Sequence, residues 1–206
     1  MIETDSDIEE GAAWLAAREP RFSEALALTG PLPLRRREGG FPALLKTICS
    51  QQLSVASADA VWNRLDAAGA TVPANLVAMD ETALRACGLS GQKIRYARAL
   101  AEADIDYREL ADLPEEEAIA RLTAIKGIGV WTAEIYLMFS VGRADVLAAG
   151  DLALQESARL LFGLPERPKD RALRELAAAW SPWRSVAARI LWAYYRVAKQ
   201  REGITE

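Results

Sequence analysis

Apolar residues recur at helical spacing along most of this 206-residue chain. Phe41, Leu44 and Ile48 fall on one face of a helix, and Val186 and Ile190 do the same near the C-terminal end. Spacings of three and four residues place side chains on one helix face, whereas a strand alternates every second residue. No segment with strand-like alternation stands out, so the pattern predicts an all-α fold.

Breaks in this pattern divide the chain into helical segments. We expect one or two helices over residues 5–28, two helices over 41–69 interrupted at 50–54, further helices over 73–104, and a last helix from 182 to about 201. Pro114 is followed by three glutamates. Proline suits the first helical position, and acids favour the positive end of the helix dipole, so another helix is predicted to begin there.

Residues 119–140 predict two helices joined by a very short turn. The sequence Lys126-Gly127-Ile128-Gly129 interrupts the first helix, and the second begins at Val130. The glycines allow a sharp reversal and leave the amides of residues 127–132 uncovered at the positive end of the second helix. Such a turn either binds a phosphate or simply connects two helices without a ligand. These residues alone leave both interpretations open.

Asp151 and Trp192 are candidate functional residues from their positions. Asp151 directly precedes an apolar-periodic helix, where an N-cap is expected, and an aspartate there is stabilised in its charged form. Trp192 lies off the apolar face of the last helix, on the side that carries Ser185, Arg189 and Arg196. Core packing explains a large aromatic among arginines poorly, so Trp192 is predicted to meet a ligand.

Two segments with these features resemble a known family. IKGIGVWTA at 125–133 and DVLAAGDLAL at 145–154 are similar to motifs of the helix-hairpin-helix (HhH-GPD) DNA glycosylase superfamily, within which the closest likeness is to 3-methyladenine DNA glycosylase II. Segments 41–58, 88–101 and 181–192 match in the same order. The resemblance covers nearly all of the chain from residue 41 onward, and it implies a DNA-binding role for the hairpin.

The resemblance and the turn pattern together assign DNA contacts. By position, Gln52 is the side chain that wedges into the gap left by an extruded nucleotide. The phosphate contacts are expected from the hairpin residues Lys126, Gly127, Gly129, Val130 and Thr132. Arg184 and Ser185, at the start of the last helix, are predicted either to hold phosphate or to brace the loop before Asp151.

The resemblance also assigns the site of chemistry. Asp151 is implied to be the catalytic aspartate, with Asp145 as a nearby structural acid; an N-cap role alone would also explain Asp151. Trp131 and Trp192 are implied to line the base pocket. Tyr136 is a further candidate, because close relatives have a tyrosine where this chain has Ile135, about 100° away around the helix from Tyr136. Main-chain carbonyls of Thr123, Ile125 and Ile128 are implied to bind a monovalent cation, Na⁺ or K⁺.

Composition limits the other possibilities. The chain has no histidine, so chemistry must use carboxylates, hydroxyls, lysines or aromatic faces. Its two cysteines cannot hold a four-cysteine iron–sulfur cluster, and buried free thiols are expected. The net charge is −4, yet residues 159–201 carry ten basic and three acidic residues, so a basic DNA-facing side is plausible. There is no apolar run of about 20 residues and no signal-peptide pattern, so a cytoplasmic protein is expected.

These expectations combine into one hypothesis. The chain is a single HhH-GPD-type unit, 1–206, with one helical lobe of about 41–140 and another of 1–30 plus 151–203, and with a substrate cleft between them. It is a monomer that binds double-stranded DNA containing damaged bases and needs no cofactor. It excises alkylated purines of the 3-methyladenine and 7-methylguanine type without lyase activity, because lyase relatives have a lysine at the position of Trp131. The alternatives are a non-catalytic DNA-binding protein and a glycosylase for deaminated or oxidised bases.

Overall fold

The computed structural model describes residues 1–202, with side chains placed through residue 200, and every regular element in this range is helical. The all-α prediction is therefore confirmed. The chain forms two compact units. The terminal unit contains residues 1–36 and the chain from residue 137 onward, and the central unit contains residues 37–136. No helix in the described range is both long and apolar enough to cross a membrane.

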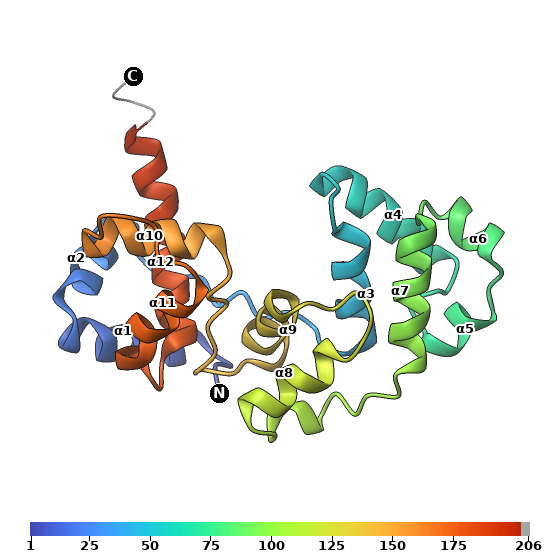
Figure 1. The fold of residues 1–206 in the computed structure, drawn as a ribbon, viewed down its shortest axis with the longest axis horizontal. Helices are drawn as coiled ribbons and strands as arrows, with labels where there is room; N and C mark the ends of the chain where they lie inside the picture. Colours follow the sequence, from blue (N-terminus) through green and yellow to red (C-terminus); the bar gives the residue numbers. More distant parts are fainter. Residues whose placement is uncertain (203–206) are drawn as a thin grey trace. The chain divides into compact units, whose positions relative to one another are not determined.

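The terminal unit packs helices from both ends of the chain around α12 (Figure 1). Its elements are α1 (Asp5–Arg18), α2 (Pro20–Thr29), the π-helical η2 (Leu137–Val141), α10 (Leu152–Phe162), α11 (Asp170–Leu176), the 3₁₀-helical η3 (Ala177–Trp180) and α12 (Arg184–Glu202). Phe22 from α2 is fully buried, with its ring edge-on to the rings of Phe162 and Trp180. Because α2 contacts both α10 and α12, the N-terminal segment completes this core.

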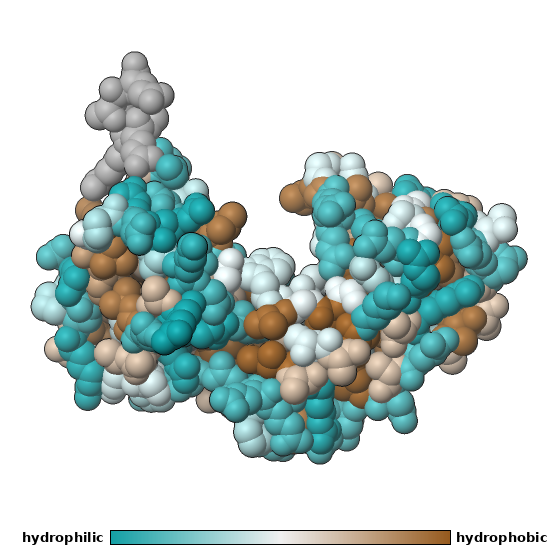
Figure 2. Space-filling view, in the orientation of Figure 1, coloured by the Kyte–Doolittle hydropathy of each residue, from teal (hydrophilic) through white to brown (hydrophobic). Residues whose placement is uncertain are grey.

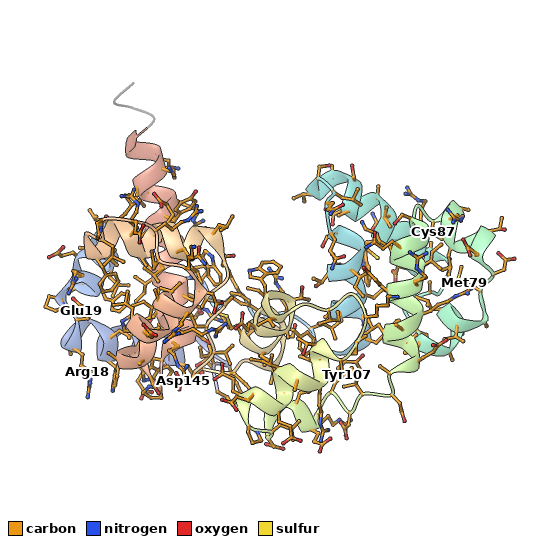
Figure 3. All side chains as sticks on the ribbon, in the orientation of Figure 1. Arg18, Glu19, Met79, Cys87, Tyr107 and Asp145 are labelled. Atoms are coloured by element: carbon orange, nitrogen blue, oxygen red, sulfur yellow. The ribbon has the colours of Figure 1, made fainter. Side chains whose placement is uncertain are left out.

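The central unit contains the remaining helices. They are α3 (Gly40–Ser50), α4 (Val55–Ala67), α5 (Pro73–Ala78), α6 (Glu81–Ala86), α7 (Gly91–Glu102), the 3₁₀-helical η1 (Glu109–Ala111), α8 (Glu115–Thr123) and α9 (Val130–Tyr136). Helix α7 packs against α3, α5 and α6. Arginines bind the carbonyls at two helix ends here: Arg98 donates to the Met79 carbonyl, and Arg64 donates to the Cys87 carbonyl. Met79 and Cys87 are labelled in Figure 3. These bonds satisfy carbonyls that lack a partner within their own helices.

Several boundaries differ from the sequence-based expectation. Pro114 is the N-cap of α8 and not its first helical residue, so the three glutamates form the whole first turn. The helix after the hairpin is short, because α9 changes to π-helical geometry at Leu137. The unit boundary falls at that change, so residues 137–140 of the predicted hairpin segment belong to the terminal unit. Residue 203, the last of the predicted second lobe, lies outside the described residues.

Both cysteines are buried free thiols, as predicted. Burial is the main influence on Cys49 and raises the pKa of its thiol to about 12, although the nearby Lys93 acts in the opposite direction. A thiol with so high a pKa stays protonated and unreactive at neutral pH. The cysteines are therefore core residues of the central unit.

Candidate functional site

Asp151 is the N-cap of α10, as its position in the sequence predicted. Its side-chain Oδ1 accepts the backbone N–H groups of Ala153 at 2.9 Å and Leu154 at 3.0 Å. Those two donors belong to the first turn of the helix, where N–H groups have no partner within the helix. The carboxylate is partly exposed and lies at the positive end of the α10 dipole. It is a fixed negative charge that remains reachable from solvent.

Trp192 is beside this carboxylate. Its indole Nε1 donates to Asp151 Oδ1 at 3.2 Å, so a third N–H group points at the same oxygen atom. The indole ring also packs against the ring of Phe139, with centroids 5.7 Å apart and planes tilted by 33°. Trp192 is therefore held at two points, by a hydrogen bond and by an aromatic contact. The structure thus brings Asp151 and Trp192 together in one unit.

Arg189, also on α12, is more buried than the sequence predicted. Arg189 was expected on a ligand-facing side of the last helix, but only 3% of its surface is exposed. Its guanidinium lies over the Phe139 ring, 4.7 Å from the centroid, and donates to the carbonyl of Ser185 at 2.8 Å. Burial, reinforced by the charges of Arg35 and Arg36, lowers the pKa of Arg189 to about 10. The guanidinium packs against Phe139 inside the unit. Phe139 lies in a π-helical segment, and the spacing rules of a regular α-helix do not predict the direction of its side chain.

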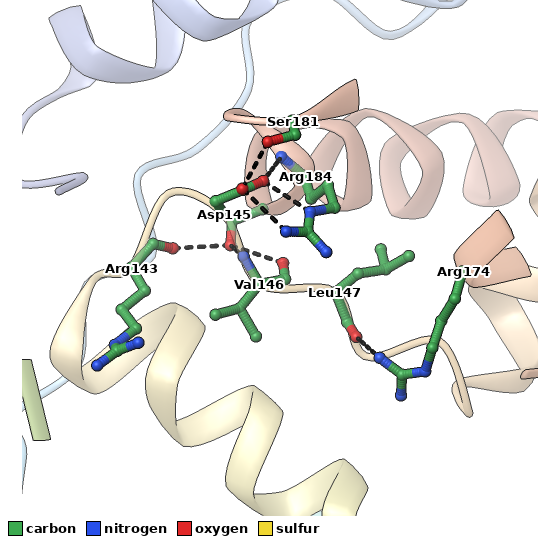
Figure 4. Close-up of polar contacts among 8 residues, drawn as sticks. Arg143, Asp145, Val146, Leu147, Arg174, Ser181 and Arg184 are labelled. Carbon is green, nitrogen blue, oxygen red and sulfur yellow. Dashed lines mark hydrogen bonds and ion pairs between the residues drawn. The ribbon is translucent and has the colours of Figure 1, made fainter. Parts of the chain in front are cut away.

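The loop before Asp151 is fixed by the start of α12 (Figure 4). The Arg184 guanidinium forms a bidentate ion pair with Asp145, through Nε at 2.7 Å and a second nitrogen at 2.9 Å. The Ser181 hydroxyl donates at 2.7 Å to Oδ2 of the same carboxylate, the oxygen that the second Arg184 nitrogen also contacts. Burial opposes ionisation of Asp145 and is the largest single influence, but the hydrogen bonds from Arg184 and Ser181 together outweigh it, so the pKa of Asp145 is lowered.

Ser185 belongs to the same brace. Its side chain is fully buried, and its hydroxyl lies 2.7 Å from the carbonyl of Arg143 and 2.8 Å from that of Val146. The hydroxyl also accepts the Val146 N–H at 3.2 Å. The buried hydroxyl offers no exposed surface to a phosphate, so the DNA contact predicted for Ser185 gains no support from these contacts. Of the two predicted roles for Arg184 and Ser185, bracing the Asp151 loop fits the observed contacts.

The central unit presents an exposed aromatic at the start of α9. Trp131 is 45% exposed and the preceding Val130 is 49% exposed, which is unusual for large apolar side chains. The surface of both units in Figure 2 is largely hydrophilic, with scattered hydrophobic patches. Thr132 is only 7% exposed, so little of this residue is available for a contact. These exposures agree with a ligand-facing start of the helix.

Tyr136 lies in a different environment from Trp131. Its side chain is 5% exposed, packs near Tyr107 with ring centroids 6.3 Å apart, and accepts the Gly40 N–H at its hydroxyl at 2.7 Å (Tyr107 is labelled in Figure 3). Burial raises the pKa of the Tyr136 hydroxyl, and the Gly40 hydrogen bond opposes this only in part. Tyr136 therefore lies in the core of the central unit.

The two hairpin glycines have different surroundings. Gly127 has a φ of +99°, and a Cβ at this position would overlap the Tyr96 side chain of α7, with three atoms closer than 3.0 Å. Nothing lies within 4 Å of a Cβ built on Gly129, and the neighbouring Lys126 is exposed. Gly127 is therefore required by the fold, whereas Gly129 leaves an open backbone surface. An anion could approach the amides of this turn from the Gly129 side.

Gln52 is at the tip of the turn between α3 and α4. Its φ is +58°, a left-handed conformation that is uncommon for a residue with a side chain. The Gln52 side chain is exposed, and it makes no hydrogen bond to any described residue. The preceding residue, Gln51, was not singled out from the sequence, yet its Nε2 donates to the Gly127 carbonyl of the hairpin at 3.1 Å.

The carbonyls expected to bind a cation lie at the last residue of α8 and in the turn after it. The Ile125 carbonyl accepts the Ile128 N–H at 3.0 Å, which leaves one lone pair of that oxygen for another partner. A helix C-terminus carries negative partial charge, so carbonyls of Thr123, Ile125 and Ile128 are chemically suited to a monovalent cation. In residues 1–200, no group of three or more histidine, cysteine or acidic side chains could hold a metal ion.

Comparison with known families gives a consistent picture. Residues 45–182 match the sequence profile of the HhH-GPD superfamily of base excision DNA repair proteins. The chain is 36% identical to DNA-3-methyladenine glycosylase 1 of Schizosaccharomyces pombe over 77% of this chain and 73% of that protein. It is 28% identical to the alkylbase DNA glycosidase-like protein mag2 of the same organism, over 91% of this chain and 94% of that protein.

Solved structures show the same similarity. The crystal structure of a DNA-3-methyladenine glycosidase from Bacillus halodurans aligns with a TM-score of 0.84 and 34% identity, over 90% of this chain and 89% of that one. The S. pombe 3-methyladenine DNA glycosylase in complex with abasic DNA aligns with a TM-score of 0.75 and 32% identity, over 89% of this chain and 95% of that one.

Proposed function

The chain belongs to the HhH-GPD superfamily of base excision DNA repair proteins, and we propose that it is a monofunctional DNA glycosylase of the 3-methyladenine glycosylase II type. It flips an alkylated purine out of double-stranded DNA and hydrolyses the N-glycosidic bond. The observation that carries this proposal is the Asp151 carboxylate, held by three N–H groups and partly exposed beside Trp192. The similarity to proteins named as DNA-3-methyladenine glycosylases supports the alkylated-purine substrate.

Asp151 acts as a carboxylate in the proposed reaction. A purine methylated at N3 or N7 already carries positive charge, so it departs as a neutral base and needs no general acid. The sugar develops oxocarbenium character as the bond breaks, as in other glycoside cleavages. A fixed negative charge stabilises that cation and orients the attacking water. The N-cap hydrogen bonds keep the carboxylate in place throughout, because both donors are backbone atoms of α10.

In the proposed reaction, an indole face favours a damaged base. Trp131 presents an exposed ring in the central unit, and Trp192 presents a partly exposed ring next to Asp151 in the terminal unit. A cationic purine gains about 2 kcal/mol on a desolvated indole face, and a neutral purine lacks this term. Selection by charge needs no directional hydrogen bonds. Such a site favours alkylated purines over deaminated or oxidised bases, which are recognised through polar groups.

Cleavage stops at the abasic site. A lyase reaction needs a lysine amine to attack the sugar and form a Schiff base. Lyase relatives place that lysine where this chain has Trp131, and indole cannot form a Schiff base. Borohydride reduction of the reaction mixture should therefore trap no covalent protein–DNA complex, whereas a trapped complex would contradict the monofunctional assignment.

The hairpin binds the DNA backbone. Its open side at Gly129 offers backbone amides, and the exposed Lys126 adds a positive charge. A Na⁺ or K⁺ ion bound to the carbonyls of Thr123, Ile125 and Ile128 would add further positive charge there. The ion is not required for the chemistry, which rests on Asp151, and we expect no other cofactor.

The decisive experiment measures release of free base from methylated duplex DNA, together with binding to a duplex that contains an abasic site. We expect wild type to release methylated purines, and we expect Asp151→Asn to lower release by at least about a hundredfold while it still binds the abasic duplex. If both proteins bind but neither releases base, the chain is a non-catalytic DNA-binding protein. Parallel assays on hypoxanthine and 8-oxoguanine duplexes test the other alternative, which requires faster release from those substrates.

A further inference from the structure

Gln52, the proposed wedge, stands at the third position of a tight turn. Gln51 has φ −52° and ψ 127°, Gln52 has φ +58°, and the Leu53 N–H donates to the Ser50 carbonyl at 3.1 Å. These values describe a type II turn, whose third position favours glycine or asparagine. A glutamine there is strained, and such strain persists only where the surrounding structure enforces it. The contacts that enforce it should therefore lie next to Gln52.

Gln51 provides one such contact directly. Its main chain forms the second position of the turn, and its side chain leaves the turn for the hairpin. The amide nitrogen Nε2 donates to the Gly127 carbonyl at 3.1 Å, in a partly buried bond between residues 76 positions apart. A carbonyl can only accept, so the side-chain nitrogen is the necessary partner. This bond joins the turn that carries Gln52 to the hairpin turn, which is proposed to bind phosphate.

Helix α7 contacts both the end of α3, next to the Gln52 turn, and the hairpin. Lys93 Nζ donates at 2.6 Å to the carbonyl of Cys49, in the last turn of α3. Tyr96, three residues further along α7, packs so closely on Gly127 that no Cβ would fit there. Residues three apart lie on the same face of a helix. One face of α7 therefore contacts both the end of α3 and the hairpin. The Gln51 side chain links these two segments to each other directly.

We propose that Gln51 is a positioning residue that locks the Gln52 turn to the hairpin, so that gripping a phosphate and inserting the wedge occur on one rigid frame. The role rests on the proposed function, because it requires that Gln52 fills the gap left by a flipped nucleotide. A wedge on a rigid frame loses less conformational freedom when it inserts than a wedge on a loose turn. Gln51 thereby favours duplexes that contain a gap over intact ones.

The test is the preference for abasic over undamaged duplex, measured as the ratio of the two dissociation constants for the full chain. Gln51→Met removes the N–H donor and nearly preserves side-chain length. We expect it to lower the preference about fivefold, the equivalent of one hydrogen bond. Asn75→Leu is the matched control, because Asn75 also donates its side-chain amide to a glycine carbonyl in the central unit, that of Gly69 at 3.1 Å. The control should keep the wild-type preference.

A double-mutant cycle separates positioning from general stabilisation. Gln52→Gly removes the wedge and suits the left-handed conformation of the turn. If Gln51 acts through Gln52, Gln51→Met causes no further loss of preference in the Gln52→Gly background. Fluorescence of 2-aminopurine opposite the abasic site, at saturating protein, should also change less with Gln51→Met than with wild type. A purely structural role would lower thermal stability without altering that signal.

The outcomes distinguish this inference from the proposed function. The positioning role would be overturned if Gln51→Met kept the wild-type preference for abasic duplex. It would also be overturned if Gln51→Met lowered that preference equally in the wild-type and Gln52→Gly backgrounds. Either result would count even if wild type releases methylated bases normally. Failure of wild type to release any base would overturn the glycosylase assignment. The duplex-binding ratio and the fluorescence signal would still decide the role of Gln51 in that case, because neither depends on cleavage.

Discussion

At the scale of single residues, one oxygen atom concentrates the features of the proposed catalytic centre. Asp151 Oδ1 accepts two backbone N–H groups and the indole N–H of Trp192. The backbone donors come with any N-cap aspartate, but the indole donor does not. We therefore propose that Trp192 contributes twice, as an aromatic face for a base and as a donor that orients the carboxylate.

Trp192→Phe separates these two contributions. Phenylalanine keeps an aromatic ring against Phe139 but removes the N–H donor. We expect base release under single-turnover conditions to slow about tenfold, because hydrogen bonds to charged groups contribute about 1.5–3 kcal/mol. Binding to an abasic duplex should change less than twofold. Trp14→Phe, in α1 of the same unit, is the control and should keep the wild-type rate. Release at the wild-type rate by Trp192→Phe would show that the indole donor has no orienting role.

At the scale of elements, the hairpin depends on two glycines for different reasons. Gly127 combines a positive φ with close packing on Tyr96, whereas Gly129 has open space where a side chain would begin. A motif of two glycines does not reveal this difference, because the first glycine is required by packing within the fold, whereas the second has no such neighbour. Alanine substitution at each position tests this difference through the free energy of unfolding and the affinity for DNA.

We predict opposite results for the two alanine variants. Gly127→Ala should lower the free energy of unfolding by about 2–4 kcal/mol, from overpacking against Tyr96 and from the positive φ. Gly129→Ala should leave the free energy of unfolding within about 0.5 kcal/mol of wild type. Its methyl group should nevertheless weaken binding to damaged and undamaged duplexes alike, by roughly fivefold. Urea unfolding and duplex titration measure both effects; wild-type DNA affinity in Gly129→Ala would remove the hairpin from the DNA-binding surface.

The same elements show how far the sequence can predict this structure. Helix periodicity located the helices, and the N-cap position of Asp151 followed from the apolar pattern after it. The buried positions of Ser185 and Arg189 did not follow, because the loop at 143–147 and the residue Phe139 cover that side of α12 only after folding. The π-helical geometry at Leu137 was also hidden, since periodicity assumes a regular α-helix. The Gln51 contact joins residues 76 positions apart, and no local pattern encodes such a contact.

At the scale of the whole molecule, charge is distributed unevenly along the chain. The first 30 residues carry seven acids and two arginines, whereas residues 159–201 carry ten basic residues and three acids. The net charge of −4 therefore conceals a basic C-terminal segment. Within that segment, Arg184 is paired with Asp145, so part of the positive charge stabilises the fold. Protonation of this carboxylate links the stability of the molecule to pH.

The Asp145 ion pair should make the protein sensitive to acid in a defined range. The pKa of Asp145 is lower in the folded protein than its ordinary value of about 3.9 in an unfolded chain. The folded state thus binds the proton less readily, so the pair contributes fully above about pH 5 and its contribution is lost as the pH falls through the folded pKa. The comparison of wild type with Asp145→Asn isolates this contribution, because all other acids titrate in both proteins. Urea unfolding should give a gap of about 1–2 kcal/mol that is constant from pH 5 to pH 7 and closes below pH 4. A gap that persists unchanged in acid would show that Asp145 stabilises the loop without its charge.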